Sequence, residues 1–193
     1  MVTNPLDLMT YHMQKVTGFP ANRVCGQAGV LDSARMTHFV ADAVGCSEED
    51  VQAMVLGGHG DTMVPLPRFT TVGGIAITHL LDEDTIDAIC QRTASGGGEI
   101  VKLLERGSAF YAPGSAAAIM AEAVLLDRKR LIPASAYLTG QYGLDDVYIG
   151  VPVILGASGI EQIFQLELSD EELSSLQKSG NFYKTQLSEL LGY

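Results

Sequence analysis

Two apolar segments in the second half of the chain constrain the fold more than any other feature. Residues 131–138 and 147–155 are predicted strands, and only a glycine-containing turn at residues 140–146 separates them. Parallel neighbours would need a crossover of a dozen or more residues. The two strands are therefore predicted to pair antiparallel.

Five segments are predicted to be helices from their apolar spacing and end signals, namely residues 5–17, 30–44, 82–105, 115–126 and a long amphipathic segment after Ser169. Residues 169–172 form a capping box. The face of this last helix expected to point inward comprises Leu173, Leu176, Tyr183, Leu187 and Leu190. Three glycines at residues 96–98 cost about 3 kcal/mol of helix propensity, so a break with a kink or a close packing contact is expected there.

The first helix has clear end signals. Asn4 is predicted to be its N-cap, Pro5 its first residue and Gly18 its end. The apolar stripe of this helix is expected to comprise Leu6, Met9, Met13 and Val16. Asn4 is also a candidate ligand contact, because α/β folds commonly bind small molecules where a strand gives way to a helix.

The remaining segments are predicted to be short strands and turns. The strands are residues 24–25, 51–56, 63–66 and 69–77, the last interrupted by two glycines. Residues 107–114 are predicted to be a loop and residues 156–159 a bend.

Composition indicates one globular domain of 193 residues and 20.6 kDa, with 47% apolar and 18% charged residues. The net charge of −11 argues against nucleic acid and anionic membranes as partners. The sequence has neither an apolar run of membrane-spanning length nor a basic-then-apolar N-terminal signal. Cys25, Cys46 and Cys90 are odd in number and widely spaced, which favours reduced thiols in a cytoplasmic protein over disulfides or a thiolate metal site.

His59 stands in a glycine-rich turn, Gly57-Gly58-His59-Gly60-Asp61, directly after a predicted strand. Because glycines leave the backbone uncrowded, the imidazole can meet a ligand closely and change its charge near neutral pH. The simpler interpretation is a tight turn whose histidine only caps backbone groups, and the five residues alone favour it.

Asp32 and Arg35 share one face of a predicted helix, because they are three residues apart. They could form an exposed ion pair worth a few tenths of a kcal/mol. Their apolar and small neighbours favour a different use, in which Asp32 orients an imidazole and Arg35 binds a carboxylate through its two-pronged guanidinium. Together with His59 as base, such a set suits the oxidation of a 2-hydroxy acid.

Three segments resemble, in order and spacing, the signatures of the lactate/malate dehydrogenase family. They are Asn4-Pro5-Leu6-Asp7, residues 31–35 (Leu-Asp-Ser-Ala-Arg) and residues 58–61 (Gly-His-Gly-Asp). The resemblance covers essentially the whole chain. It implies that residues 1–193 are the C-terminal substrate-binding and catalytic domain, with an α+β fold of antiparallel sheet pieces packed with long helices.

The resemblance also implies a role for each matching residue. His59 is similar to the family's proton acceptor, Asp32 to its orienting partner and Arg35 to the arginine that holds the C1 carboxylate of the substrate. Val2, Thr3 and Asn4 resemble the end of the cofactor-binding segment, with Asn4 touching both the nicotinamide of NAD and the substrate. The loop at residues 107–114 resembles the malate branch, since lactate enzymes usually carry threonine where Ala109 stands. The implied reaction is the NAD-dependent interconversion of malate and oxaloacetate, small dicarboxylates.

Two features of the family are missing from the sequence. It contains no G-x-G-x-x-G, so the N-terminal Rossmann half is expected to be absent, and so is the mobile loop whose arginines bind the distal carboxylate. The first helix and Val2-Thr3 are then expected to be uncovered, and such apolar patches usually recruit a partner. A homo-oligomer, dimer or tetramer, is predicted.

Three other functions are open to such a chain. A metal-dependent hydrolase could use His59 and Asp61 with one of the other histidines, but the spacing of a zinc helix is lacking, and so is the G-x-S-x-G of a serine hydrolase. The stronger alternative is a truncated, catalytically inactive family member that serves as an oligomerisation or binding module. No metal is expected.

Overall fold

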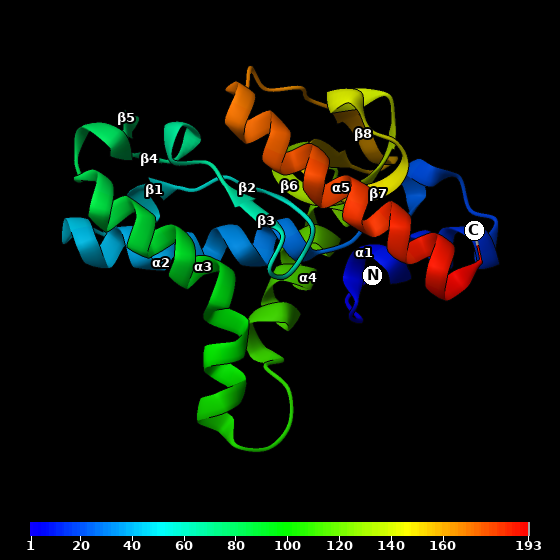
Figure 1. The fold of residues 1–193 in the computed structure, drawn as a ribbon, viewed down its shortest axis with the longest axis horizontal. Helices are drawn as coiled ribbons and strands as arrows, with labels where there is room; N and C mark the ends of the chain where they lie inside the picture. Colours follow the sequence, from blue (N-terminus) through cyan, green and yellow to red (C-terminus); the bar gives the residue numbers. More distant parts are fainter. Residues whose placement is uncertain (193) are drawn as a thin grey trace.

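The computed structural model describes residues 1–192 and centres on a five-stranded antiparallel sheet. Its strands lie in the order β3-β2-β7-β6, and β8 also pairs with β7. They are β2 (Val55–Gly57), β3 (Met63–Pro65), β6 (Arg130–Thr139), β7 (Asp145–Gly156) and β8 (Gly159–Ile163). Figure 1 shows this sheet next to the C-terminal helix.

The long hairpin β6–β7 confirms the predicted antiparallel pair. Its register runs from Leu131 opposite Ile154 to Leu138 opposite Val147. The turn between the strands contains a short 3-10 helix, Gln141–Gly143. Strand β7 is the centre of the main core, with its residues from Val147 to Val153 completely or almost completely buried.

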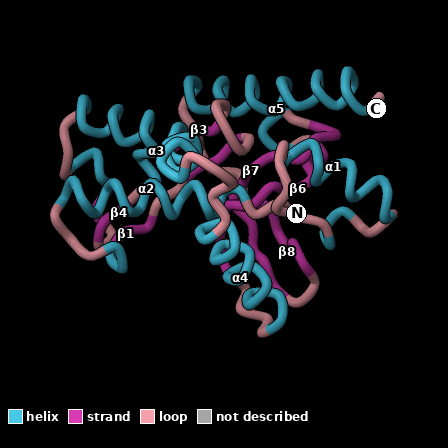
Figure 2. The backbone as a smooth tube through the Cα atoms, turned by 90° about the horizontal axis from the view of Figure 1, so that it is seen from below, coloured by secondary structure: helices cyan, strands magenta, loops and turns pink. Residues whose placement is uncertain are grey.

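Five helices surround the sheets and confirm the α+β class. They are α1 (Leu6–Thr17), α2 (Ala28–Val44), α3 (Glu83–Leu104), α4 (Tyr111–Leu125) and α5 (Asp170–Leu191). Helices α1, α4 and α5 pack on β7, and α2 packs on β6 (Figure 2). At the other end of the molecule, α2 and α3 lie beside a small sheet, and a second apolar core fills the space between them. The chain has no helix, within residues 1–192, that is long and apolar enough to cross a membrane.

Three of the short predicted strands are wrong in detail. Residues 51–56 split into β1 (Val51–Gln52) and β2, because β1 pairs with β4 in the small sheet while β2 joins the large one. Residues 69–77 form a small hairpin, β4 (Thr71–Val72) and β5 (Ile75–Ala76), which turns at the two glycines. Residues 24–25 form no strand, since pairing there is limited to a single bridge between Gly26 and Ser135.

The start and the buried face of α1 also differ from the prediction. Pro5 is extended and is itself the N-cap, because its carbonyl accepts the first helical hydrogen bond from the Met9 N–H. Asn4 is therefore not the cap. The buried side chains include Leu8 and Tyr11, whereas Met13 and Val16 are exposed. Val2 and the far end of α1 are exposed.

Helix α3 continues through its three glycines rather than breaking, and Figure 1 shows that it bends at mid-length. The close packing contact is present as well. A Cβ on Gly96 would lie 3.3 Å from Cδ of Arg35, and a Cβ on Gly97 would lie 3.2 Å from its Nη2. The absence of side chains on α3 thus makes room for the Arg35 guanidinium.

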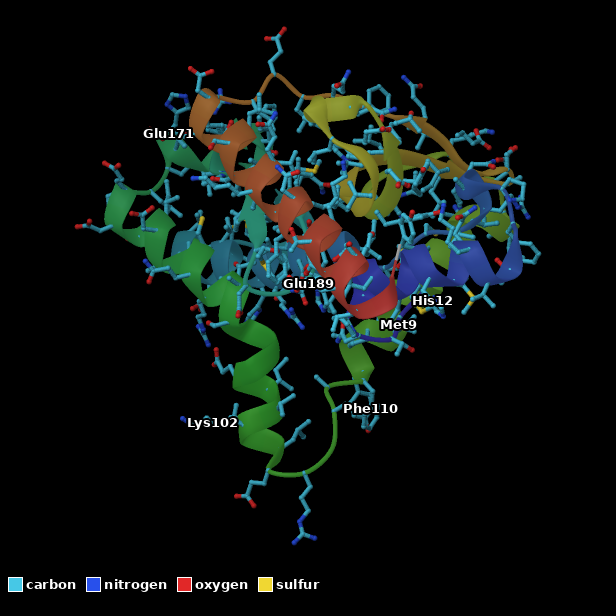
Figure 3. The ribbon with its side chains drawn as sticks, turned by 45° about the vertical axis from the view of Figure 1, so that its right-hand side comes forward. Met9, His12, Lys102, Phe110, Glu171 and Glu189 are labelled. Atoms are coloured by element: carbon cyan, nitrogen blue, oxygen red, sulfur yellow. The ribbon has the colours of Figure 1, made fainter. Side chains whose placement is uncertain are left out.

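Two further boundaries are corrected. Helix α4 begins at Tyr111, inside the predicted loop, and in α5 the Leu190 side chain is exposed because the helix extends past the core. The capping box at Ser169 is confirmed, with both of its hydrogen bonds to Glu172 present. The second half of α3 and the loop after it form an arm (residues 100–111) that projects from the body, as the labelled Lys102 and Phe110 show in Figure 3.

Candidate functional site

The histidine turn connects β2 to β3, and α1 and α5 hold its backbone. The Gly58 N–H donates to Oγ of Ser179 at 3.0 Å, and the His59 N–H donates to Oδ2 of Asp7 at 2.8 Å. The Tyr183 hydroxyl donates to the His59 carbonyl at 3.3 Å. The turn is therefore positioned by contacts that are far away in the sequence.

Gly58 is required by the closeness of α5 to this turn. A Cβ at this position would collide with the ring of Tyr183. We expect Gly58→Ala to lower the free energy of unfolding by about 1–3 kcal/mol, because the ring and the turn must move apart. Urea denaturation measures this change.

Gly98→Ala is the matched control for that substitution. A Cβ at Gly98 meets no atom within 4 Å, and the residue lies inside α3. We expect Gly98→Ala to be neutral or to stabilise by roughly 0.5–1 kcal/mol. Equal urea midpoints for Gly58→Ala and the unsubstituted chain would contradict the packing argument.

The structure brings His59, Asp32 and Arg35 together. Nδ1 of His59 lies 2.9 Å from Oδ2 of Asp32, and Nη1 of Arg35 lies 3.0 Å from Oδ1 of the same carboxylate. Asp32 is only 2% exposed, so the pair is not a solvated surface ion pair. One buried carboxylate thus contacts both the imidazole and the guanidinium, and His59 does more than cap backbone groups.

Burial and charge act in opposite directions on His59. Burial lowers its pKa, but the hydrogen bond and the charge of Asp32, with a smaller contribution from Asp7, raise it further than burial and Arg35 lower it. The net result is a raised pKa. Because Nδ1–H is donated to Asp32, Nε2 is the ring nitrogen left to take up a proton.

A cleft of about 750 Å³ opens in front of this cluster. Its walls come from the N-terminal segment, the histidine turn, the arm and parts of α2, α3 and α4. The predicted site residues that line it are Val2, Thr3, Asn4, Arg35 and His59. Asp32 does not line the cleft and lies behind the imidazole.

The N-terminal segment reaches the cleft because Met1 is tied to the chain before α2. The Met1 amino group donates to the carbonyl of Cys25 at 2.6 Å, and the Gln27 N–H donates to the carbonyl of Met1 at 3.1 Å. These two bonds place Val2, Thr3 and Asn4 at the rim. Their position therefore depends on backbone contacts, which the sequence pattern did not reveal.

Two residues of the site were not predicted. Gln27 lines the cleft, is 3% exposed, and its Oε1 has no hydrogen-bond partner in the described chain. Asp7 lies under His59, and its only signal in the sequence was its place in the Asn4-Pro5-Leu6-Asp7 motif. A buried, unpaired amide oxygen beside a cleft indicates room for a ligand with a hydrogen-bond donor.

Metal ligation finds no support in this region. No group of three or more histidine, cysteine, aspartate or glutamate side chains in residues 1–192 is arranged to hold a metal ion. The three cysteines are free thiols.

Comparison with known proteins shows which family the chain belongs to. Residues 29–191 match the sequence model described as the lactate/malate dehydrogenase, alpha/beta C-terminal domain. The chain is 57% identical over 189 residues to malate dehydrogenase 1 of Anaeromyxobacter dehalogenans, covering 98% of this chain and 61% of that protein. It is 55% identical over 190 residues to malate dehydrogenase of Roseiflexus sp. (strain RS-1), covering 98% of this chain and 62% of that protein.

Solved structures show the same architecture. Malate dehydrogenase from Salinibacter ruber matches with a TM-score of 0.95 and 52% identity, over 97% of this chain and 61% of that one. Lactate dehydrogenase from Eimeria maxima with NADH and oxamate matches with a TM-score of 0.95 and 44% identity, over 98% of this chain and 59% of that one. The chain thus spans about three fifths of the length of these proteins.

Proposed function

Because the chain belongs to the lactate/malate dehydrogenase family, we propose that it carries the substrate-binding and catalytic residues for the NAD-dependent interconversion of malate and oxaloacetate. The observation that carries this proposal is the His59–Asp32–Arg35 cluster at the wall of the cleft. It joins a base whose charge changes near neutral pH to a cation that suits a carboxylate.

Each residue of the cluster has one task in the oxidation of malate. Nε2 of His59 takes the hydroxyl proton, and Asp32 stabilises the imidazolium that results. Arg35 binds the C1 carboxylate, and the absence of side chains at Gly96 and Gly97 leaves its guanidinium room to do so. Asn4 contacts the substrate from the rim of the cleft.

Residues at the rim of the cleft suit the nicotinamide end of NAD. Val2, Thr3 and Asn4 would hold it, and the unpaired Oε1 of Gln27 suits a carboxamide, which has N–H donors. When bound, NAD accepts the hydride from the carbon that carries the hydroxyl group. We assign the binding of the adenosine half of NAD to a separate dinucleotide-binding domain, because this sequence has no glycine-rich phosphate loop.

The preference for malate over lactate rests on the arm. Ala109, which lies in the loop that resembles the malate branch, lines the cleft. Arg35 is the only arginine or lysine among the residues that line the cleft within the described chain. The distal carboxylate of malate would therefore be bound by residues outside residues 1–192.

The test joins this chain to the N-terminal part of the Roseiflexus malate dehydrogenase. We expect the chimaera to reduce NAD with malate, and to do so far faster than with lactate, as followed by NADH absorbance. The isolated chain should bind NAD weakly or not at all by calorimetry, because the phosphate-binding loop is not in it. A folded chimaera without activity would favour the alternative of a catalytically inactive binding module, and a micromolar NAD affinity of the isolated chain would contradict the assignment of the adenosine site.

We also propose that the protein is a cytoplasmic homo-oligomer, a dimer or a tetramer. The arm supports this, because its apolar side chains are exposed, among them Val101, Leu103, Leu104, Phe110 and Tyr111. The three free thiols support a reducing compartment. Light scattering of the chimaera and cell fractionation test these two points, and a monomer over a wide concentration range would contradict the first.

A further inference from the structure

Asp7 is a buried carboxylate that the mechanism above does not use. It is 1% exposed and lies in the first turn of α1. Its two oxygens bind different parts of the fold: Oδ2 accepts the His59 N–H at 2.8 Å, and Oδ1 accepts the Ser135 hydroxyl at 2.6 Å. Asp7 thus connects the histidine turn to the central hairpin.

Burial makes the charged form of Asp7 costly, and its neighbours compensate for that cost only in part. A buried charge is costly unless hydrogen bonds and nearby charges compensate for it. Both oxygens of Asp7 have donors, and the N-terminus of α1 favours a negative charge through the helix dipole. An apolar residue or a neutral amide would avoid the cost, so the charge itself has a use.

Charge balance indicates what that use is. The carboxylate of Asp32 is shared between His59 and Arg35, and the charge of Arg35 offsets part of the effect of Asp32 on the imidazole. In the absence of substrate, protonation of His59 gives the cluster two cations and, without Asp7, only one anion. Asp7 supplies the second anion and makes the protonated cluster neutral.

We propose that Asp7 is a positioning residue for the proton acceptor: it fixes the backbone of His59 and favours the imidazolium form of its ring. This inference rests on the proposed role of His59 as the proton acceptor. Asp7 acts through the backbone and through charge, and it does not touch the substrate.

The titration of Asp7 depends first on its burial and then on neighbouring groups. His59 faces it from the turn, Asp32 from α2, Ser135 from β6 and Tyr183 from α5. Burial raises the pKa of Asp7 to about 6, against the lowering by Ser135 and His59. Burial also raises the pKa of Tyr183 to about 12, so its hydroxyl is neutral around Asp7. Asp7 is therefore charged at neutral pH and loses its charge in mild acid.

The test compares Asp7→Asn with the unsubstituted chain by NMR. Asparagine keeps the shape and can still accept the His59 N–H, but it has no charge. We expect the pKa of the His59 ring to fall, and the His59 amide to exchange with solvent faster because a neutral acceptor holds it less firmly. Unchanged ring titration and unchanged amide exchange would overturn the proposal.

The pH dependence of the free energy of unfolding gives a second test, and the direction of the change can be predicted. The folded-state pKa of Asp7, about 6, is above its ordinary value of 3.8. Its contribution to stability is therefore complete below 3.8 and is lost as the pH rises through about 6. The stability of Asp7→Asn relative to the unsubstituted chain should rise over this interval, and a pH-independent difference would contradict the assignment.

Two variants make the result specific. Asp146→Asn is the matched control, because the Asp146 carboxylate also accepts two hydrogen bonds, from Tyr11 and Tyr137, but does not touch His59. It should leave the His59 titration unchanged. If Asp7→Asn does not fold, Ser135→Ala takes its place. It removes only one of the two hydrogen-bond donors to Asp7, so it should raise the pKa of Asp7 and leave the exchange of the His59 amide slow. An unchanged pKa of Asp7 would overturn the assignment.

The chimaera adds a catalytic readout. Asp7→Asn should lower kcat/KM for malate by about 10- to 100-fold, because a misplaced base loses its alignment with the hydroxyl. The acid limb of the pH profile for malate oxidation should move to lower pH, since the neutral imidazole then persists further into acid. The NMR measurements need neither cofactor nor substrate, so their failure is distinct from a failure of the proposed dehydrogenase function.

Discussion

Asp32→Asn is expected to lower malate oxidation by the chimaera by about 10³- to 10⁴-fold, the range known for replacing the carboxylate that orients a catalytic histidine. Asparagine is nearly the same shape but carries no charge. The imidazolium formed when His59 takes the hydroxyl proton would lose its anionic partner at 2.9 Å. Arg35 would lose its ion pair at the same time.

The pKa of His59 gives this prediction a second measurement. Burial lowers that pKa, and Asp32 is the main group that raises it, so the pKa should fall in Asp32→Asn. Since the folded-state pKa is the raised one, the stability it contributes is complete below the unfolded value and disappears as the pH rises through the folded value. In the variant, this extra stability on the acid side should be missing.

NMR titration of the His59 ring and urea denaturation at several pH values measure these effects. Asp42→Asn is the matched control, because Asp42 lies on the same helix, is exposed and has no contact with His59. Equal ring midpoints in Asp32→Asn and in the unsubstituted chain would show that Asp32 does not orient this histidine.

Arg35→Leu is expected to raise KM for malate by about 10²- to 10³-fold. A two-pronged, charge-assisted pair with a carboxylate would be lost, and each such hydrogen bond contributes roughly 1.5–3 kcal/mol. Arg35→Lys should recover part of the affinity, since lysine keeps the charge but cannot present two parallel donors. Steady-state kinetics of the three proteins with malate test this order.

The ring of His59 distinguishes this effect from general damage to the site. The charge of Arg35 lowers the pKa of His59, so Arg35→Leu should raise it, the opposite of Asp32→Asn. Circular dichroism and urea midpoints control for folding. If Arg35→Leu kept both the KM for malate and the ring titration of His59, the carboxylate-binding role would be wrong.

Local features of the sequence were sufficient for much of the fold. The hairpin β6–β7 followed from the length of its connection, and the start of α5 from its capping box. The predictions were wrong where tertiary contacts override the local apolar pattern of the sequence. Residues 51–56 look like one strand but serve two sheets, and Leu190 continues an apolar stripe beyond the end of the core.

Some residues of the candidate site could be predicted from the sequence, and others could not. Asp32 and Arg35 could be placed on one face from their spacing alone, and His59 was marked by the glycines around it. Gln27 and Asp7 could not be recognised from spacing. Gln27 matters because its amide oxygen is buried without a partner, and burial depends on the packed fold.

The sequence by itself determined the elements whose causes are local: the capped start of α5, the tight hairpin, the glycine turn and the i, i+3 pair on α2. Only the tertiary structure decided which of these meet. His59 reaches Asp32 across 27 residues and Asp7 across 52, and Asp7 reaches Ser135 across 128. Such contacts form because the sheet and helices bury their apolar faces together, which no local period or spacing encodes. The charge balance around the imidazole is therefore a property of the packed fold.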